Sequence, residues 1–174
     1  MRGKALGIGL SACVFAGAMM AATGVAQATT SYSFHTPSGS DLWYNPSPAL
    51  FQGSSTNETP LQGELPTSTG VGFGGTWKLP NGDCMAFYAS GSKGSDLVDD
   101  HACNSATYEE WTVTKQSNGT YYFSNSYSDT YYGVCGYVNS YAYYTILTES
   151  GGYFGMECPT GKNETPGSNQ EFDK

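Results

Sequence analysis

Residues 84–111 have the sequence CMAFYASGSKGSDLVDDHACNSATYEEW, and this stretch decides the fold. Cys84 and Cys103 are separated by eighteen residues, and Trp111 follows eight positions after the second cysteine. Residues that favour strands flank a centre rich in Gly and Ser, a pattern typical of two short strands joined by a turn. We therefore expect a β-hairpin closed by a disulfide.

The same order of features returns later in the chain. Cys135 is followed by a tyrosine-rich run, then by Cys158, and then by the sequence Asn-Gln-Glu-Phe at residues 169–172. In that sequence Phe172 occupies the place that Trp111 has in the first copy. The chain is therefore expected to contain an internal repeat.

The first residues have the features of a secretory signal peptide. Arg2 and Lys4 precede an apolar run over residues 5–22, and the small-residue sequence Ala-Gln-Ala follows at residues 26–28. Cleavage after Ala28 leaves 146 of the 174 residues. We expect residues 1–28 to be removed and residues 29–174 to be secreted into the extracellular space as one domain, because this length suits a single core.

The cysteine count predicts two disulfides. Cys13 lies in the leader, so four cysteines remain in a compartment that favours oxidation. Four cysteines allow three connectivities, and the repeated order of features favours the sequential one. The expected pairs are Cys84 with Cys103 and Cys135 with Cys158.

Charge restricts the classes of partner. The chain has 7 basic and 15 acidic residues and a net charge of −8, which becomes −10 when Arg2 and Lys4 leave with the signal peptide. A strongly acidic domain is unsuited to nucleic acid or to anionic membrane surfaces, which attract basic patches. No later segment is long and apolar enough for membrane insertion. Neutral ligands such as glycans, or a basic protein, are the expected partners.

Local patterns predict an all-β fold. No window shows the sustained apolar spacing of an amphipathic helix, so none is expected. Short runs rich in strand formers are bounded by glycine turn signals at Asn81-Gly82, Asn118-Gly119 and Gly151-Gly152, which suit tight turns with positive φ. These runs are residues 86–88, 111–113, 121–123 and 143–147.

Residues 29–77 give weaker signals. They are rich in Ser, Thr, Pro and Gly and are compatible with a linker. Against this interpretation, Leu42, Trp43, Tyr44, Leu50 and Phe51 place five large apolar side chains within ten residues. We therefore expect this segment to pack into the domain as a degenerate or irregular first repeat, with residues 54–75 as its most mobile portion.

Tyrosine is the most unusual residue in the composition. Nine of the fourteen tyrosines fall between Tyr121 and Tyr144. Most are expected to fill a small β core with their hydroxyls reaching the surface. Because side chains alternate along a strand, the unbroken aromatic run at residues 141–144 must place some rings outside, where they offer flat faces for sugar rings.

Catalytic and metal motifs are weak. Asp99-Asp100-His101 places two carboxylates beside an imidazole, but on a strand only Asp99 and His101 share a face. The adjacent pair Glu109-Glu110 diverges for the same reason. No zinc-ligand spacing, phosphate-binding loop or nucleophile elbow occurs, so neither a metal nor another cofactor is expected. Carboxylates that meet only in the folded chain leave no linear motif, so a small hydrolase stays as an alternative.

The two cysteine-containing copies resemble repeats of the ricin-B-type β-trefoil lectins. Repeats of that family begin with Cys-Leu-Asp-Val, carry a second cysteine followed by Asn-Gly, and end with Gln-x-Trp. The corresponding stretches here are 84–87, 103–105 and 109–111 in one copy, and 135–138, Cys158 and 169–172 in the other. The sugar-orienting Asp of the family is replaced by Ala86 in the first copy and by Tyr137 in the second, and the Gln of the first Gln-x-Trp is Glu109.

The resemblance implies a β-trefoil-like single domain with repeats at residues 29–77, 78–118 and 119–174. It also implies sugar pockets in which a carboxylate or amide contacts hydroxyls and an aromatic ring stacks beneath the sugar. The nearest equivalents are Asp99, His101 and Asn104 in one copy, and Tyr137, Asn169 and Gln170 in the other.

Three functions from different classes are compatible with these features. The first is a secreted, non-catalytic carbohydrate-binding protein directed at glycans or cell-surface carbohydrate. The second is a secreted factor that binds a basic protein, such as an inhibitor or a toxin subunit. The third is a small secreted hydrolase.

Overall fold

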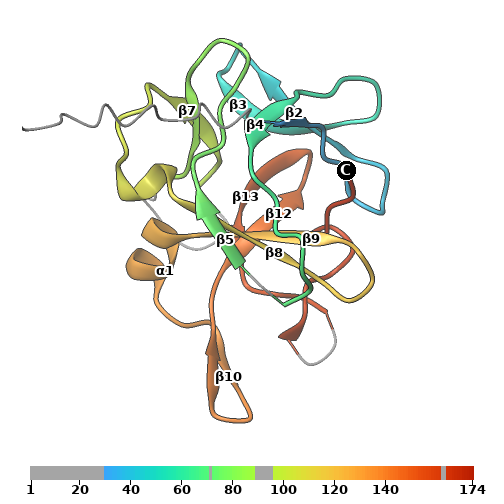
Figure 1. Cartoon of the computed structure of the whole chain (residues 1–174), viewed down its shortest axis with the longest axis vertical. Helices are drawn as coiled ribbons and strands as arrows, with labels where there is room; N and C mark the ends of the chain where they lie inside the picture. The colour runs from blue at the N-terminus through green and yellow to red at the C-terminus, as the bar shows by residue number, and fades with distance from the viewer. Residues whose placement is uncertain (1–29, 71, 89–95, 162–163) are drawn as a thin grey trace, which may run out of the picture.

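The computed structural model describes residues 30–70, 72–88, 96–161 and 164–174, so the predicted signal peptide lies outside the described residues. Within them the chain is built of short strands with a single α-helix and one turn of 3-10 helix, η1 (Figure 1). The elements are β1 (Thr30–Tyr32), β2 (Asp41–Asn45), β3 (Leu50–Ser54), β4 (Leu61–Gly63), β5 (Gly72–Gly75), β6 (Cys84–Ala86), β7 (Asp99–His101), η1 (Thr107–Glu109), β8 (Trp111–Lys115), β9 (Tyr121–Asn125), α1 (Ser126–Tyr132), β10 (Gly136–Val138), β11 (Tyr141–Tyr143), β12 (Ile146–Ser150) and β13 (Tyr153–Glu157). The all-β prediction is confirmed.

Three antiparallel hairpins meet in the largest sheet. They are β2–β3, β6–β7 and β12–β13. Each hairpin touches the other two through a single antiparallel residue pair. These pairs are Leu50↔Asp99, Tyr153↔Gln52 and Leu97↔Gly155.

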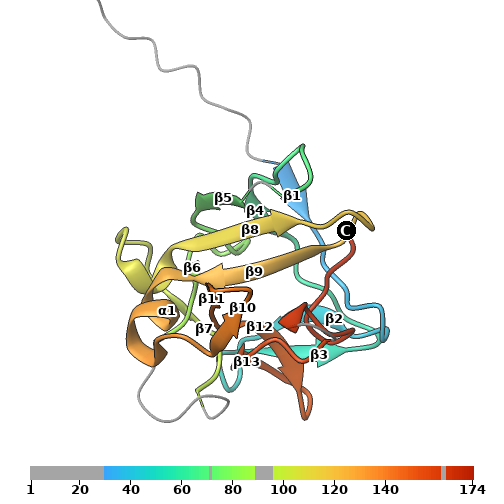
Figure 2. The same cartoon turned by 90° about the horizontal axis from the view of Figure 1, so that it is seen from below.

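The remaining strands form smaller antiparallel sheets, and none of the sheets in the described residues closes on itself. β8 lies between β5 and β9, and Figure 2 shows β8 and β9 side by side over their whole length. β1 pairs with β4, and the β10–β11 hairpin projects from the body of the molecule (Figure 1). Isolated bridges Gln62↔Lys78, Tyr121↔Phe172 and His35↔Asp173 link these pieces.

The glycine turns are where the sequence predicts them. Gly82, Gly119 and Gly152 have φ of 95°, 94° and 85°, values that residues with a Cβ rarely adopt. The turn at residues 79–83 closes with a 2.8 Å hydrogen bond from the Leu79 amide to the Asp83 carbonyl. Residues 116–120 form the same turn between β8 and β9, again with a 2.8 Å bond. The turns therefore set the register of the strands they join.

The centre of the core is a triad of aromatic rings from three separate parts of the chain. Phe34, Trp77 and Phe123 are at most 1% exposed. Their ring centroids are 5.3 Å (Phe34 to Trp77), 5.0 Å (Phe34 to Phe123) and 5.5 Å (Trp77 to Phe123) apart, all edge to face. Phe172 continues the cluster at 5.4 Å from Phe123. Edge-to-face contacts add to the stabilisation from burial alone.

Trp111 anchors the first disulfide-closed copy. Its side chain is fully buried, and its indole N–H donates a 2.8 Å hydrogen bond to the Met85 carbonyl on β6. Both predicted disulfides are present, Cys84–Cys103 and Cys135–Cys158. The predictions of a buried tryptophan and of sequential cysteine pairing are confirmed.

The N-terminal segment packs into the same core. Phe34, Leu42, Phe51 and Leu61 are fully buried and belong to the same hydrophobic cluster as Trp111. The linker alternative for residues 29–77 is therefore wrong, because side chains of this segment supply part of the central core.

The expectation that most tyrosines fill the core is wrong. Tyr121 is the only tyrosine of the described residues in the buried core, and the core consists mainly of Phe, Trp, Leu and Met. Six tyrosines are exposed, with Tyr137 at 68% and Tyr141 at 80%. Short strands offer few inward positions, and rings without a polar atom fill them without needing a hydrogen-bond partner.

Two other local predictions need correction. Residues 126–132 form the helix α1, which begins because the Asn125 side chain accepts hydrogen bonds from the amides of Tyr127 and Ser128. Seven residues are too few to show a helical apolar period. The run 143–147 is not one strand: β11 ends at Tyr143 and β12 begins at Ile146.

We predict that Gly63→Ala destabilises the domain by about 1 to 3 kcal/mol, as overpacking of a core does. A Cβ at this position would lie 2.5 Å from Cε3 of the buried Trp77 ring. Urea unfolding followed by tryptophan fluorescence measures the loss.

Gly75→Ala is the matched control, since a Cβ there meets nothing within 4 Å. Equal stability of the two variants would contradict the proposed packing of Trp77 against β4.

Candidate functional site

A cleft forms where the first disulfide-closed copy folds back on itself. β6 and β7 pair so that Ala86 lies opposite Asp99 and Cys84 lies opposite His101. The disulfide to Cys103 then ties the segment after β7 to the start of β6. The backbone at the base of the cleft is therefore held by the antiparallel pairing of β6 with β7 and by the Cys84–Cys103 disulfide.

The alternation of side chains along β7 determines which groups face the cleft. Asp99 and His101 both line it, together with Ala86, Tyr88 and Tyr108, in a cavity of about 280 Å³. Asp100 lies between them on the strand, and its carboxylate hydrogen-bonds to the Tyr44 hydroxyl instead. The prediction that Asp99 and His101 share a face is confirmed.

Asp99 is an unusual carboxyl group. Burial raises its pKa to about 6, and the neighbouring negative charge of Asp100 adds to the shift. A backbone hydrogen bond and the nearby His101 act in the opposite direction without cancelling it. Asp99 therefore changes between a neutral and a charged acceptor within a weakly acidic pH range.

Glu109 supports the cleft from inside the protein. It is fully buried, and its Oε2 accepts hydrogen bonds from the amides of Asn104 at 3.0 Å and of Ser105 at 2.9 Å. Ser105 has a positive φ of 62°, so these bonds hold the chain in a turn that it would not otherwise prefer. Glu109 is thus a positioning group for the segment after Cys103, and a ligand has no access to it.

Tyr108 forms one wall, and Asn104 holds it in place. The side-chain amide of Asn104 donates a 2.8 Å hydrogen bond to the Tyr108 hydroxyl, and its side-chain oxygen accepts one from the Ala106 amide at 2.9 Å. The Tyr108 ring lies edge to face with His101, with centroids 5.1 Å apart. The predicted residue Asn104 therefore does not line the cleft itself but orients an aromatic ring that does.

A row of tyrosines continues from the cleft. The Tyr88 and Tyr127 rings are stacked with centroids 5.4 Å apart, and Tyr127 is stacked on Tyr131 at 5.9 Å. Tyr88 is 60% exposed and Tyr131 is 48% exposed. The row therefore presents aromatic surface to solvent beside Asp99.

Reasoning from the sequence missed this row. Tyr127 and Tyr131 are four residues apart on α1 and hence lie on one face of the helix. Asn125 is a residue type that favours the N-cap of a helix. A helix predicted to start after Asn125 would have placed Tyr127 and Tyr131 on one face. Tyr88 and Tyr108 come from other parts of the chain, and no local pattern connects them with α1.

The second predicted set does not form a site. Gln170 is fully buried, and its side chain bonds to the amides of Thr160 at 2.8 Å and Gly167 at 2.9 Å, and to the Cys158 carbonyl at 2.9 Å. The Asn169 amide donates to the Glu149 carbonyl at 2.9 Å. Tyr137 lies on β10, in the projecting hairpin, and is exposed, whereas Gln170 is fully buried. Gln170 and Asn169 hold backbone in place, so the structure does not gather these three residues.

No group of three or more His, Cys, Asp or Glu side chains in the described parts of the chain is arranged to hold a metal ion. Among the same residues, no helix has the length and apolar character needed to cross a membrane.

Comparison with known proteins returns no match. No protein-family model, no curated protein and no solved structure is significantly similar to this chain.

The raised pKa of Asp99 predicts a pH-dependent stability. The folded state keeps the Asp99 proton up to about pH 6, whereas the unfolded chain releases it near the ordinary aspartate pKa of 3.8. The folded state therefore binds more protons in this range, and the free energy of unfolding must fall as pH rises.

Asp99→Asn removes this contribution. The stability of the wild type relative to the Asp99→Asn variant should therefore be highest near pH 4 and should decrease to a plateau above pH 6. Urea unfolding at a series of pH values measures the difference. A difference that is constant, or that increases with pH, would show that Asp99 is not buried as described.

Proposed function

We propose that this protein is a secreted, non-catalytic carbohydrate-binding protein with a β-trefoil-like, ricin-B-type fold, and that the Asp99 cleft is its sugar site. The observation that carries the proposal is the meeting of a half-buried carboxyl with exposed, ordered tyrosine rings. Sugar recognition requires such a pair, an acceptor for hydroxyls and a flat aromatic face for the apolar side of the ring.

The mutual pairing of the three hairpins supports the trefoil proposal. A trefoil has one hairpin per repeat, and the three hairpins close one end of the molecule. The hairpins β2–β3, β6–β7 and β12–β13 fall one in each of the three proposed repeats. Backbone hydrogen bonds through Val98, the residue before β7, also connect the three hairpins. The Phe51 amide of β3 donates to the Val98 carbonyl at 2.9 Å, and the Val98 amide donates to the Phe154 carbonyl of β13 at 2.8 Å.

The strands outside the hairpins supply further support. In a trefoil the first and last strands of the three repeats alternate around a six-stranded barrel. Here six antiparallel pairings, of strands or of single residues, link the segments outside the hairpins in series. They are β1 with β4, Gln62 with Lys78, β5 with β8, β8 with β9, Tyr121 with Phe172, and Asp173 with His35.

The buried residues at the ends of two repeats have matching roles. Glu109 and Gln170 are both fully buried, and both accept hydrogen bonds from backbone amides of the preceding segment. Each is followed two residues later by a buried aromatic residue, Trp111 or Phe172. This supports the resemblance at the Gln-x-Trp positions, with the polar residue as a structural anchor.

The cleft accounts for the missing family carboxylate. Ala86 takes the place of the sugar-orienting Asp, and Asp99 lies directly opposite Ala86 in the β6–β7 ladder. A carboxylate on the neighbouring strand thus reaches the same cavity. Above pH 6 it is charged, and a charged acceptor forms stronger hydrogen bonds to hydroxyls than a neutral one.

The tyrosine row favours a glycan of several units over a single sugar. Tyr88 and Tyr131, the exposed rings at its two ends, extend the aromatic surface beyond the cleft, and each offers its outer face to a sugar ring. Secretion is part of the same proposal. It rests on the leader at residues 1–28, and the two disulfides agree with an oxidising compartment.

We predict that Asp99→Ala lowers the affinity for the bound glycan by about 1.5 to 3 kcal/mol, since it removes a charged acceptor, while the protein stays folded. A glycan array with residues 29–174 identifies the ligand, and calorimetric titration of wild type and variant measures the loss.

Asp100→Asn is the matched control, because Asp100 is the next residue on β7 and its carboxylate contacts Tyr44 outside the cleft. An equal loss in both variants would indicate a general charge effect. An array without any bound glycan, or turnover of the glycan, would contradict the proposed function.

The tyrosine row generates a separate prediction. Tyr88→Ala should weaken binding of an oligosaccharide by about 0.5 to 1.5 kcal/mol, the worth of an aromatic contact, and should leave monosaccharide binding nearly unchanged. Tyr88→Phe should keep the affinity because it keeps the ring.

Tyr137→Ala is the control, since Tyr137 is 68% exposed but belongs to the β10–β11 hairpin. If Tyr137→Ala weakened binding and Tyr88→Ala did not, the glycan would lie on the hairpin and not along the row.

A further inference from the structure

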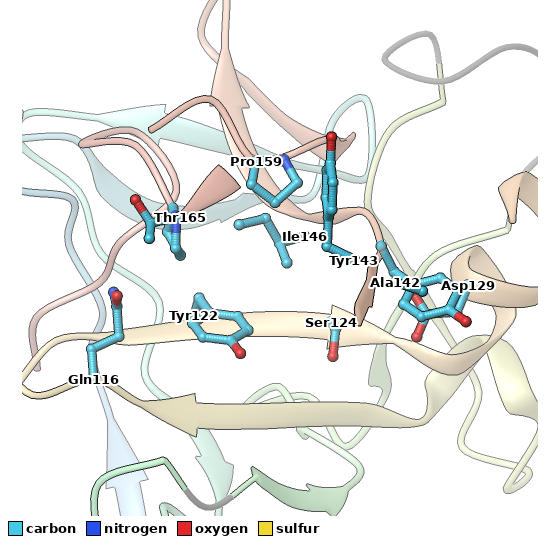
Figure 3. A pocket seen from close by; sticks show the side chains of 11 residues that line it. Gln116, Tyr122, Ser124, Asp129, Ala142, Tyr143, Ile146, Pro159 and Thr165 are labelled. Carbon is cyan, nitrogen blue, oxygen red and sulfur yellow. The ribbon is translucent and has the colours of Figure 1, made fainter. Parts of the chain in front are cut away.

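A larger cavity lies on another part of the surface and takes no part in the Asp99 cleft. Its volume is about 390 Å³, compared with about 280 Å³ for the cleft, and the two share no lining residue among those described. Figure 3 shows Tyr122 and Ser124 of β9 along one side, Tyr143 and Pro159 opposite them, and Asp129 of α1 at one end. Residues of β9, of α1, of the segment 142–146 and of the segment 159–166 therefore build most of it.

Asp129 is the only acidic side chain among the described residues that line this cavity, and one of its oxygens lacks a partner. Its Oδ1 is buried and has no hydrogen-bond partner in the described structure. Burial alone raises the pKa of this carboxyl to about 6. The backbone of Asp129 is separately satisfied, because its carbonyl accepts a hydrogen bond from the Gly133 amide at the end of α1. The group without a hydrogen-bond partner is therefore an oxygen of the side chain and not the backbone carbonyl.

No basic side chain in the described lining of the cavity compensates the charge. None of these lining residues is Lys, Arg or His. A half-buried carboxylate without a counter-charge is costly, and near neutral pH this one carries its charge. A bound group that brings a positive charge to the carboxylate would reduce this cost.

Aromatic rings surround the same space. Tyr122, Tyr143 and Tyr144 all line the cavity, and burial together with the nearby Glu164 raises the pKa of the Tyr143 hydroxyl. Tyrosine faces attract cations through the negative potential above the ring. Ile146 and Pro159 complete an apolar wall that suits a short alkyl chain.

We propose that this cavity binds a primary ammonium group carried on a short aliphatic chain, with Asp129 as its anion and the tyrosine rings around it. A quaternary ammonium has no N–H to donate to the carboxylate that lines the cavity. A neutral alcohol offers a donor but leaves the carboxylate charge uncompensated. The acidic chain, with a net charge of −8, attracts cations to the surface in general, and the cavity selects among them.

The test compares n-butylammonium with 1-butanol, which has the same chain and a neutral donor. Titration at about pH 8 keeps Asp129 ionised and the amine protonated. NMR chemical-shift changes locate the bound molecule, and we expect saturable binding of the amine with at least tenfold weaker binding of the alcohol. Nα-acetyllysine methylamide, titrated in parallel, shows whether the preferred source of the ammonium is a free amine or a lysine side chain of a polypeptide.

Asp129→Asn keeps the size of the side chain and removes its charge. We expect it to lower the affinity for n-butylammonium at least tenfold and to keep or increase stability above pH 6, because the wild-type Oδ1 has no hydrogen bond to lose. Tyr143→Leu should weaken binding several-fold. Tyr137→Leu is the control, since Tyr137 is exposed and does not line the cavity.

Several results would overturn the proposal. Equal binding of amine and alcohol would show an apolar pocket without charge selection. The same conclusion follows if binding survives Asp129→Asn, or if only Asp99→Asn abolishes it. Resonance shifts at the cavity caused by a glycan and not by the amine would make it a second sugar site.

Discussion

The mutual contact of Phe34, Trp77 and Phe123 is the interaction on which the rest of the structure depends. Each ring comes from a different part of the chain, and each contacts the other two within 5.5 Å. The strands are at most five residues long, so no sheet in the described structure supplies enough contact by itself. Burying these rings together joins the short sheets into one core. The close approach of Gly63 to Trp77 shows how little space remains around that centre.

Around this core, buried polar groups hold the loops that build the clefts. Glu109 fixes the segment after Cys103, and Gln170 fixes the segment after Cys158, each through bonds to backbone amides. Satisfied polar groups of this kind add specificity because the alternative loop arrangements leave them without partners. The side chains that remain for ligands, Asp99 and Asp129, are the ones whose pKa burial raises to about 6. The two candidate sites thus share one principle, a partly buried carboxyl held beside aromatic rings.

Much of the local structure was predictable from particular residues. The spacing of the cysteines and their repeated context predicted the pairing Cys84–Cys103, and the glycine turns occur as expected. Alternation along a strand was enough to place Asp99 and His101 on one face. The tyrosines were misplaced because composition does not tell a core ring from a surface ring. Gln170 was assigned to a sugar pocket, whereas the folded chain surrounds it with backbone amides.

The sequence by itself determined the all-β class, the glycine turns, the disulfides and the acidic character, because each of these depends on residues that are close in sequence or on a simple count. Only the tertiary structure decided where ligand-facing surface lies. Tyr88 and Tyr127 are 39 positions apart in sequence, and their stacking depends on how α1 packs against η1 and β9. The same holds for Asp129, which shares a cavity with side chains of β9, of β11 and of the segment around Pro159. Burial raises a pKa through the whole surrounding volume, and no local sequence pattern encodes that volume.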